Sequence, residues 1–165
     1  MGPSGVGKSC LCLRLTNGTF NAKMESTVGA AFLSKTIQAQ GVTVKLEIWD
    51  TSGNEKYQAL LPMYQRGANG MLLLFDLTNP ESFAKVPSFY KKMQSNITTT
   101  NFASALVGTK CDLIHERKIS TLDAQNWATH HGIQYYEVSS SSSINIDEVF
   151  AGLASTILEK TIPLK

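Results

Sequence analysis

A glycine-rich octet at the start of the chain has the residue types and the spacing of a loop that binds a polyphosphate. Residues 2–9 read Gly-Pro-Ser-Gly-Val-Gly-Lys-Ser, which fits G-x-x-x-x-G-K-[ST]. The glycines permit positive φ angles and bring backbone N–H groups close to phosphate oxygens. Lys8 supplies a positive charge for the β- and γ-phosphates, and the Ser9 hydroxyl can bind Mg²⁺. A helix that starts near Gly7 would direct its positive end at the same anion.

Two more polar groups follow apolar runs of the chain. Asp50 ends an alternating apolar run and precedes a turn at Gly53. A carboxylate at a strand end, followed by a glycine turn, suits a residue beside a metal ion with a backbone N–H donor next to it. Residues 109–112 read Thr-Lys-Cys-Asp and follow a second, continuous apolar run at residues 102–108. The pattern thus predicts a metal-side carboxylate at Asp50 and a polar group at a strand end over residues 109–112.

The elements that position these groups follow from hydrophobic spacing and from turn residues. With 165 residues, the chain has the length of one domain with a substantial core. The first part of the chain is expected to form a helix ending at Asn17-Gly18, a loop over 20–30, two strands that turn at Gln40-Gly41 and a short irregular helix over 57–66. A strand over 70–76 and helical structure from Asn79-Pro80, interrupted at Pro87, are expected next. The last part is expected to form a strand over 102–108, a helix from Ser120 to Gly132, a strand over 134–138 and a helix capped by Asn145 and Glu148.

The alternation of strands and helices from Gly70 onward predicts an α/β fold. Residues 70–76 read Gly-Met-Leu-Leu-Leu-Phe-Asp, a continuous apolar run that is typical of a strand buried on both faces of a parallel sheet. The helices carry apolar stripes that we assign to the core. These stripes comprise Phe83, Val86, Tyr90, Met93 and Ile97, then Leu122, Ala124 and Trp127, and finally Ile146, Val149, Phe150, Leu153 and Ile157.

Period-two alternation in the two hairpin strands predicts two large aromatic side chains on the outer face. In the second strand Val42, Val44, Leu46 and Ile48 face the core, which leaves Trp49 outside. In the first strand, Phe32 falls on the outer face in the same way. Two aromatics on neighbouring strands suggest a surface for a protein partner.

Composition excludes several functional classes. The net charge of +2, with acidic and basic residues nearly balanced, gives no electrostatic reason to expect nucleic-acid binding. No apolar run approaches the length of a membrane span, and no signal peptide opens the chain. The cysteines, Cys10, Cys12 and Cys111, have neither framework nor metal-site spacing, so we expect free, buried thiols in a reducing compartment.

The ordered set of motifs resembles the small GTPases of the Ras superfamily, and within it the Rab family. The telling stretches are residues 25–32 (Glu-Ser-Thr-Val-Gly-Ala-Ala-Phe), 48–51 (Ile-Trp-Asp-Thr) and 62–68 (Pro-Met-Tyr-Gln-Arg-Gly-Ala), with Thr109-Lys110-Cys111-Asp112 as the base-reading motif and Glu137-Val138-Ser139 as its helper loop. The likeness covers nearly the whole chain and is greatest to the early-endosomal Rabs. It implies a three-layer α/β/α P-loop NTPase domain over residues 1–165, with a mostly parallel sheet and one antiparallel edge strand.

The resemblance also implies the ligands and their residues. The expected ligands are GTP or GDP and Mg²⁺. Nucleotide-binding residues would be Ser4, Gly5, Val6, Gly7, Lys8, Ser9, Cys10, Phe20, Thr27, Gly53, Thr109, Lys110, Asp112, Ser139 and Ser140. The metal residues would be Ser9, Thr27 and Asp50, and the catalytic residues would be Asn54, Lys8, Thr27 and Gly53. Asp112 can accept two N–H bonds from guanine, which selects that base.

The same resemblance implies a switch that hydrolyses GTP slowly and recruits effectors in its GTP state, in vesicle trafficking. Effectors would contact Phe32, Trp49 and Tyr64, and an exchange factor and a GTPase-activating protein are expected partners of a monomer. Its place would be cytoplasmic, at the cytosolic face of endosomal or other vesicle membranes for a form with a lipidated tail. No cysteine follows Cys111, so we expect this form not to hold stably to a membrane.

Several residues depart from the family pattern. Asn54 stands where the family has the glutamine that positions the attacking water, and its shorter side chain predicts weak hydrolysis. Thr109 replaces an asparagine, although its hydroxyl can still tie this loop to the phosphate loop. Residues 139–141 read Ser-Ser-Ser in place of Ser-Ala-Lys, which predicts weaker base binding, and Pro3 removes one donor from the phosphate loop.

The sequence leaves alternatives open. Only Met1 precedes the octet, although such a loop follows a buried strand, so we expect a domain that is incomplete at its N-terminus and has no first central strand. A hydrolysis-deficient, GTP-bound scaffold and a non-functional truncated fragment are therefore alternative interpretations. A P-loop small-molecule kinase is a more distant one, because it would give Asp112 and the Thr27 loop no role.

Overall fold

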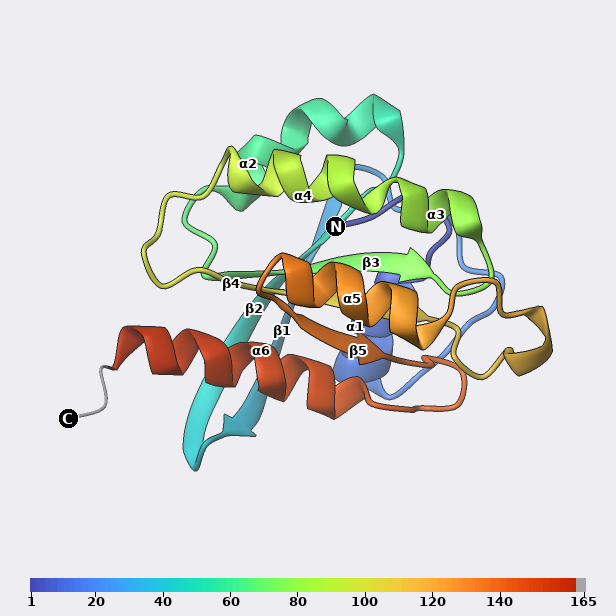
Figure 1. Cartoon of the computed structure of the whole chain (residues 1–165). Coiled ribbons are helices and arrows are strands. Elements are labelled where there is room, and N and C mark those ends of the chain that lie inside the picture. The colour runs from blue at the N-terminus through green and yellow to red at the C-terminus, as the bar shows by residue number, and fades with distance from the viewer. Residues whose placement is uncertain (163–165) are drawn as a thin grey trace.

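The computed structural model describes residues 1–162 and has an α/β architecture (Figure 1). The helices are α1 (Lys8–Asn17), α2 (Leu61–Gln65), α3 (Pro80–Ala84), α4 (Val86–Gln94), α5 (Thr121–His130) and α6 (Ile146–Thr161), with 3₁₀ turns η1 (Glu55–Leu60) and η2 (Ile114–Glu116). The strands are β1 (Ala30–Ala39), β2 (Val42–Thr51), β3 (Gly70–Asp76), β4 (Ala103–Thr109) and β5 (Gln134–Glu137). The order and type of the elements expected from the sequence are confirmed.

The strands form two sheets. β1 and β2 make an antiparallel hairpin, whereas β3, β4 and β5 pair in parallel in that order. Between them, Met1 lies against the free edge of β3: its N-terminal ammonium donates to Leu72 O (2.6 Å), and the Leu74 N–H donates to Met1 O (2.8 Å). Met1 therefore pairs with β3 at the edge that faces the β1–β2 hairpin.

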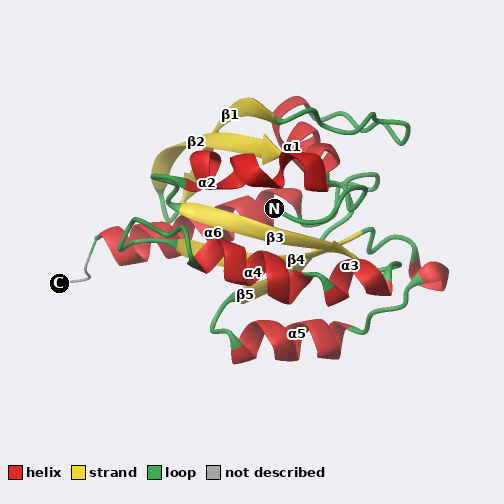
Figure 2. Cartoon of the chain, turned by 90° about the horizontal axis from the view of Figure 1, so that it is seen from above, coloured by secondary structure: helices red, strands yellow, loops and turns green. Residues whose placement is uncertain are grey.

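The continuous apolar run of β3 is buried on both faces, as expected. Leu73 and Phe75 pack into a core with α4 and α5, while Leu74 points the opposite way into a core with α1 and α6. Figure 2 shows the helices on the two sides of the β3–β5 sheet. Because successive side chains of a strand alternate between faces, one short strand anchors both layers.

Three details of the sequence interpretation are wrong. Val42 is 45% exposed, because it directly follows the hairpin turn, which projects at the lower edge of Figure 1. Leu122 is 68% exposed, since Ala124 and Ala128 are the residues of α5 that face the core. Ile97 is 38% exposed, because α4 has already ended at Gln94.

The start of α6 is also held differently from the expectation. Asn145 has a left-handed backbone (φ 57°), and its side-chain amide donates to Glu137 O at 2.8 Å instead of capping the helix. By contrast, the Ser120 hydroxyl accepts from the Asp123 N–H (3.0 Å) and caps α5 as expected. The interruption expected at Pro87 is also present, because α3 ends at Ala84 and α4 begins at Val86.

Candidate functional site

The loop before α1 encloses one end of a cavity of about 510 Å³. Gly5 (φ 80°) and Gly7 (φ 96°) have left-handed backbones, which only glycine adopts at low cost, and Gly7 leads directly into α1. Lys8 reaches back across the loop and donates from Nζ to Pro3 O at 2.7 Å. Burial lowers the pKa of Lys8 to about 8, although the Asp50 carboxylate raises it in part. The loop thus places the Lys8 ammonium next to a backbone whose left-handed glycines can direct N–H groups at an anion.

Most of the expected nucleotide residues line this one cavity, although they come from distant parts of the chain. Those residues are Ser4, Gly5, Val6, Gly7, Lys8, Ser9, Cys10, Phe20, Thr27, Gly53, Thr109, Lys110, Asp112 and Ser140. Ser139 does not line it: this residue is fully buried, and its N–H donates to Ile144 O at 3.1 Å. Ser139 therefore supports the loop from behind, and its N–H is already in use.

The three expected metal residues meet at one point. The Ser9 hydroxyl donates to Asp50 Oδ2 and lies 2.6 Å from Thr27 Oγ1. Burial raises the pKa of Asp50, although the Ser9 hydrogen bond and the Lys8 charge oppose that shift. Asp50 Oδ1 is buried and has no hydrogen-bond partner among the described residues. Mg²⁺ prefers hard oxygen ligands of this kind, so the residues present fit the ion.

Gly53 lies against the phosphate loop so closely that no side chain would fit. A Cβ atom at this position would collide with Ser4 N and with Lys8 Nζ. The turn after β2 is therefore in direct contact with the loop before α1. This contact brings the Gly53 backbone beside Lys8, the residue expected to pair with the γ-phosphate.

Asn54, the next residue, does not reach the nucleotide cavity. Its side-chain Oδ1 accepts the Lys56 N–H at 3.0 Å and caps η1. Asn54 lines a separate cavity of about 420 Å³, to which Ser4 and Gly53 also contribute. Of the four residues expected to be catalytic, the structure places Lys8, Thr27 and Gly53 at the cavity and leaves Asn54 outside it.

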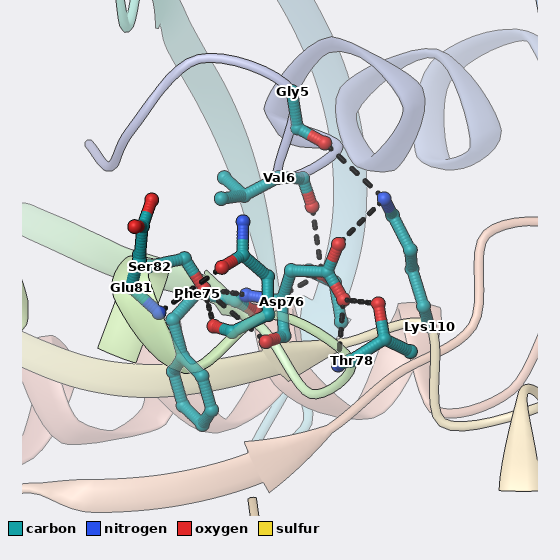
Figure 3. Close-up of polar contacts among 10 residues, drawn as sticks. Gly5, Val6, Phe75, Asp76, Thr78, Glu81, Ser82 and Lys110 are labelled. Carbon is teal, nitrogen blue, oxygen red and sulfur yellow. Dashed lines mark hydrogen bonds and ion pairs between the residues drawn. The ribbon is translucent and has the colours of Figure 1, made fainter. Parts of the chain in front are cut away.

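The end of β4 is tied to the phosphate loop, as expected from Thr109. The Thr109 hydroxyl is buried and lies 2.6 Å from Val6 O and 3.0 Å from Phe75 O. Lys110, with a left-handed backbone (φ 62°), makes a second connection by donating to Gly5 O at 3.3 Å (Figure 3). Two consecutive residues therefore join the expected base-reading motif to the loop that would hold the phosphates.

Asp76 is a site residue that the sequence interpretation missed. At the end of β3, its Oδ2 forms an ion pair with Lys110 Nζ at 2.6 Å, and its Oδ1 accepts two hydrogen bonds from Thr78 (Figure 3). The carboxylate is buried, so the pair is shielded from water on the Asp76 side. An acidic residue at the end of a buried apolar run was the available signal.

Arg14 is a second residue that was missed. From the last turn of α1 it donates to Ser140 O (2.6 Å), Ser141 O (3.1 Å) and Gly18 O (2.9 Å). It fixes the backbone of residues 139–143, all of them serines and called the serine loop below, beside the cavity. A basic residue among the leucines of this helix was the only sign in the sequence.

The outer-face aromatics of the hairpin are exposed as expected. Phe32 is 51% and Trp49 is 50% exposed, and they face each other in the β1–β2 register. Their ring centroids are 5.1 Å apart, and Tyr64 of α2 lies 5.2 Å from Trp49. The triad begins close to the Asp50–Gly53 turn, so it adjoins the candidate site.

The cysteines are all free thiols, as expected, but they differ in burial. Cys12 is buried, whereas Cys10 and Cys111 are only partly so. Burial raises the pKa of each thiol. Among residues 1–162, no group of three His, Cys, Asp or Glu side chains could hold a metal ion.

Comparison with known proteins shows the family to which this chain belongs. The sequence profile of the Ras family matches residues 1–159. The chain belongs to the Ras family. It is 38% identical over 161 residues to the Ras-related proteins Rab-13 of Rattus norvegicus and of Bos taurus, an alignment that covers 98% of this chain and 79% of each relative.

The matches identify a small GTPase of Rab type. Members of the family bind GTP or GDP with Mg²⁺, hydrolyse GTP and contact effectors, exchange factors and activating proteins. Within residues 1–162, no helix is both long and apolar enough to cross a membrane.

Proposed function

We propose that the chain is a GTP-binding switch that acts in vesicle trafficking at the cytosolic face of a membrane. One observation carries this proposal: Ser9 and Thr27, which line the same cavity as Asp112, meet beside the Asp50 carboxylate, whose Oδ1 is buried and has no hydrogen-bond partner among the described residues. Such a cavity has a polyphosphate end and a base end. Its shape and chemistry favour a purine nucleoside triphosphate with a divalent cation.

In this proposal, different polar groups bind the ligand at the phosphate end and at the base end of the cavity. Lys8 pairs with the β- and γ-phosphates, and the backbone of residues 4–9 donates to their oxygens. When bound, Mg²⁺ supplies positive charge that neutralises the phosphate oxygens. Ser9, Thr27 and Asp50 are the residues that would hold it. Asp112 accepts N–H groups of guanine, while Phe20 and the Lys110 side chain cover the base.

The switch rests on two segments that reach the γ-phosphate from different elements. Thr27 stands in the loop before β1, and Gly53 stands in the turn after β2. Both segments adjoin the hairpin that carries Phe32 and Trp49, so ordering them orders the aromatic surface. We propose that effectors bind Phe32, Trp49 and Tyr64 in the GTP state. Exchange and activating proteins would act on a monomer.

We expect this chain to hydrolyse GTP slowly. The Asn54 amide oxygen caps η1, and Asn54 is not among the residues that line the nucleotide cavity, so we expect it to orient the attacking water poorly. The family mechanism needs such a water-positioning residue. A hydrolysis-deficient, GTP-bound scaffold is therefore the second candidate function, which the placement of Asn54 favours.

Following the bound nucleotide over time tests the proposal. Purified chain is loaded with GTP in the presence of Mg²⁺, freed of excess nucleotide and sampled over hours by chromatography. A slow switch converts the bound GTP to GDP, whereas a scaffold keeps it as GTP. Chain that retains no guanine nucleotide contradicts both functions.

A further inference from the structure

The serine loop contributes a hydroxyl to the residue that is expected to read the base. Ser141 Oγ donates to Asp112 Oδ2 at 3.1 Å, and it also lies 3.1 Å from Ser139 Oγ. Ser141 and Asp112 both line the nucleotide cavity. The family pattern places a lysine at position 141, so this contact belongs to the serine of this chain.

The backbone that carries Ser141 is held in place from three sides. Arg14 binds the carbonyls of Ser140 and Ser141, at 2.6 and 3.1 Å. The Ser142 N–H donates to Ser139 Oγ at 3.0 Å, and the backbones of Ser139 and Ile144 exchange two hydrogen bonds. The Ser141 hydroxyl can rotate about its side-chain bonds, whereas its Cα is fixed beside Asp112. The hydroxyl therefore stays within reach of Asp112 at the base end of the cavity.

A hydroxyl at this point changes how the carboxylate discriminates between bases. Guanine offers Asp112 two donors, the ring N1–H and the exocyclic 2-amino group. Hypoxanthine has the same ring N–H and the same 6-oxo group, but it has no 2-amino group. A site rejects such an analogue because the carboxylate oxygen that lost its donor remains unpaired. Here Ser141 already donates to Asp112 Oδ2, so the carboxylate keeps a donor when the base has no 2-amino group.

We propose that Ser141 is a specificity-determining residue that widens the ligand class of this cavity from guanine to 6-oxopurine nucleotides. Inosine 5′-triphosphate then binds nearly as well as GTP, because the Ser141 hydroxyl replaces the missing amino donor. A carboxylate offers about four acceptor positions, so Ser141 and guanine can also be bound together. Adenine lacks the N1–H donor and stays excluded. This inference rests on the proposed function.

The test compares the affinities of three nucleotides for three variants. A fluorescent guanine nucleotide bound in the presence of Mg²⁺ is displaced by GTP, ITP or ATP. For the natural chain, the ITP and GTP affinities should agree within about fivefold, which is a small difference in binding free energy. In Ser141→Ala the preference for GTP over ITP should grow by about tenfold, the worth of one charge-assisted hydrogen bond, through weaker ITP binding.

Two further variants separate the hydroxyl from the fold of the loop. Ser141→Thr keeps a hydroxyl and should restore the natural ratio. Ser142→Ala removes a neighbouring exposed hydroxyl and should leave the ratio unchanged. Thermal unfolding of each variant, free and with GTP, shows that the loop is intact.

Each remaining outcome contradicts a defined claim. An unchanged ratio in Ser141→Ala, or a natural chain that rejects ITP by a factor far above tenfold while binding GTP, overturns the role of Ser141 and leaves the proposed function standing. A natural chain that binds neither GTP nor ITP overturns both.

Discussion

At the scale of single residues, the most informative atom is Asp50 Oδ1. The other carboxylate oxygen, Oδ2, accepts a hydrogen bond from the Ser9 hydroxyl, while Oδ1 is buried without a donor among the described residues. A buried carboxylate oxygen without a partner costs free energy, and the raised pKa of Asp50 has the same cause, burial. A cation ligated at this point removes that cost. The strained site is therefore an argument for the ligand it would hold.

Asn54→Gln tests the explanation of weak hydrolysis. The added methylene frees the amide from the cap of η1 and lets it reach toward the γ-phosphate, so single-turnover GTP hydrolysis should accelerate by at least about tenfold. The matched variant Asn54→Ala should hydrolyse GTP at the natural rate, because the natural amide lies outside the cavity. If Asn54→Ala slows hydrolysis tenfold, or an activating protein and Asn54→Gln both leave the rate unchanged, the account of Asn54 is wrong.

Asp76→Asn tests the ion pair behind the base motif. Asparagine can still accept from Thr78 but has no charge to hold the Lys110 ammonium, so bound GDP should dissociate about tenfold faster. The matched variant Thr78→Val removes a donor from the opposite oxygen of Asp76 and leaves the ion pair in place. It should lower the melting temperature without changing GDP release. Equal release rates for Asp76→Asn and the natural chain would contradict a role for this pair in nucleotide binding.

At the scale of elements, β5 and α5 are joined by one carboxylate. Glu137 receives Arg117 Nη1 at 2.9 Å, and the hydroxyls of Tyr135 and Thr121 each at 2.8 Å. Burial alone would raise the pKa of Glu137, but these hydrogen bonds outweigh burial and lower it below its ordinary value of 4.5. The folded chain therefore favours the ionised carboxylate, and this network supports the strand that leads into the serine loop.

Glu137→Gln should change how stability depends on pH. Because the pKa is lowered on folding, the unfolded state binds more protons in acid, and the stabilisation by Glu137 is lost as pH falls through the folded pKa. The natural chain should be more stable than Glu137→Gln at about pH 7, and the difference should shrink as pH falls below about 4.5. Urea unfolding across this range measures it. Glu47→Gln, which affects only an exposed pair with Lys45, is the control and should show little pH-dependent difference. A Glu137 difference that is constant with pH would contradict the assignment.

Elements whose residues interact locally were predictable from the sequence. The two faces of the hairpin, the Ser120 cap and the buried β3 run follow from period and from turn chemistry. Contacts between residues distant in sequence were predictable only where the family resemblance supplied them, as for Thr109 and the phosphate loop. Asn145 forms its hydrogen bond with Glu137, and Arg14 reaches the serine loop more than a hundred residues later. No local pattern encodes such contacts.

Two expected site residues, Asn54 and Ser139, do not line the cavity, and in each a bond to a near neighbour in the sequence accounts for this. Asn54 was placed by likeness to a family position, whereas its own local hydrogen bond to the Lys56 N–H turns it into a cap. Asn commonly caps helices in this way, and the local bond competes with a reach into the cavity. Ser139 was expected at the ligand, but the Ile144 pairing buries it.

At the scale of the whole molecule, the nucleotide cavity lies where two sheets meet that share no strand pairing among the described residues. The β1–β2 hairpin and the β3–β5 sheet are separate, and the loops at their ends meet at the cavity. A ligand that touches Thr27 and Gly53 on one side and Asp112 on the other therefore holds both halves together. A bound nucleotide should stabilise the fold as a whole, in proportion to its concentration relative to its dissociation constant.

Competition between GTP and ATP for the cavity tests the central claim most directly. A fluorescent guanine nucleotide is bound to the purified chain with Mg²⁺, and unlabelled GTP or ATP is added in increasing amounts. Because the Asp112 carboxylate accepts donors that only the 6-oxopurine presents, GTP should displace the probe at concentrations at least about a thousandfold lower than ATP. Equal displacement by the two nucleotides would contradict the account.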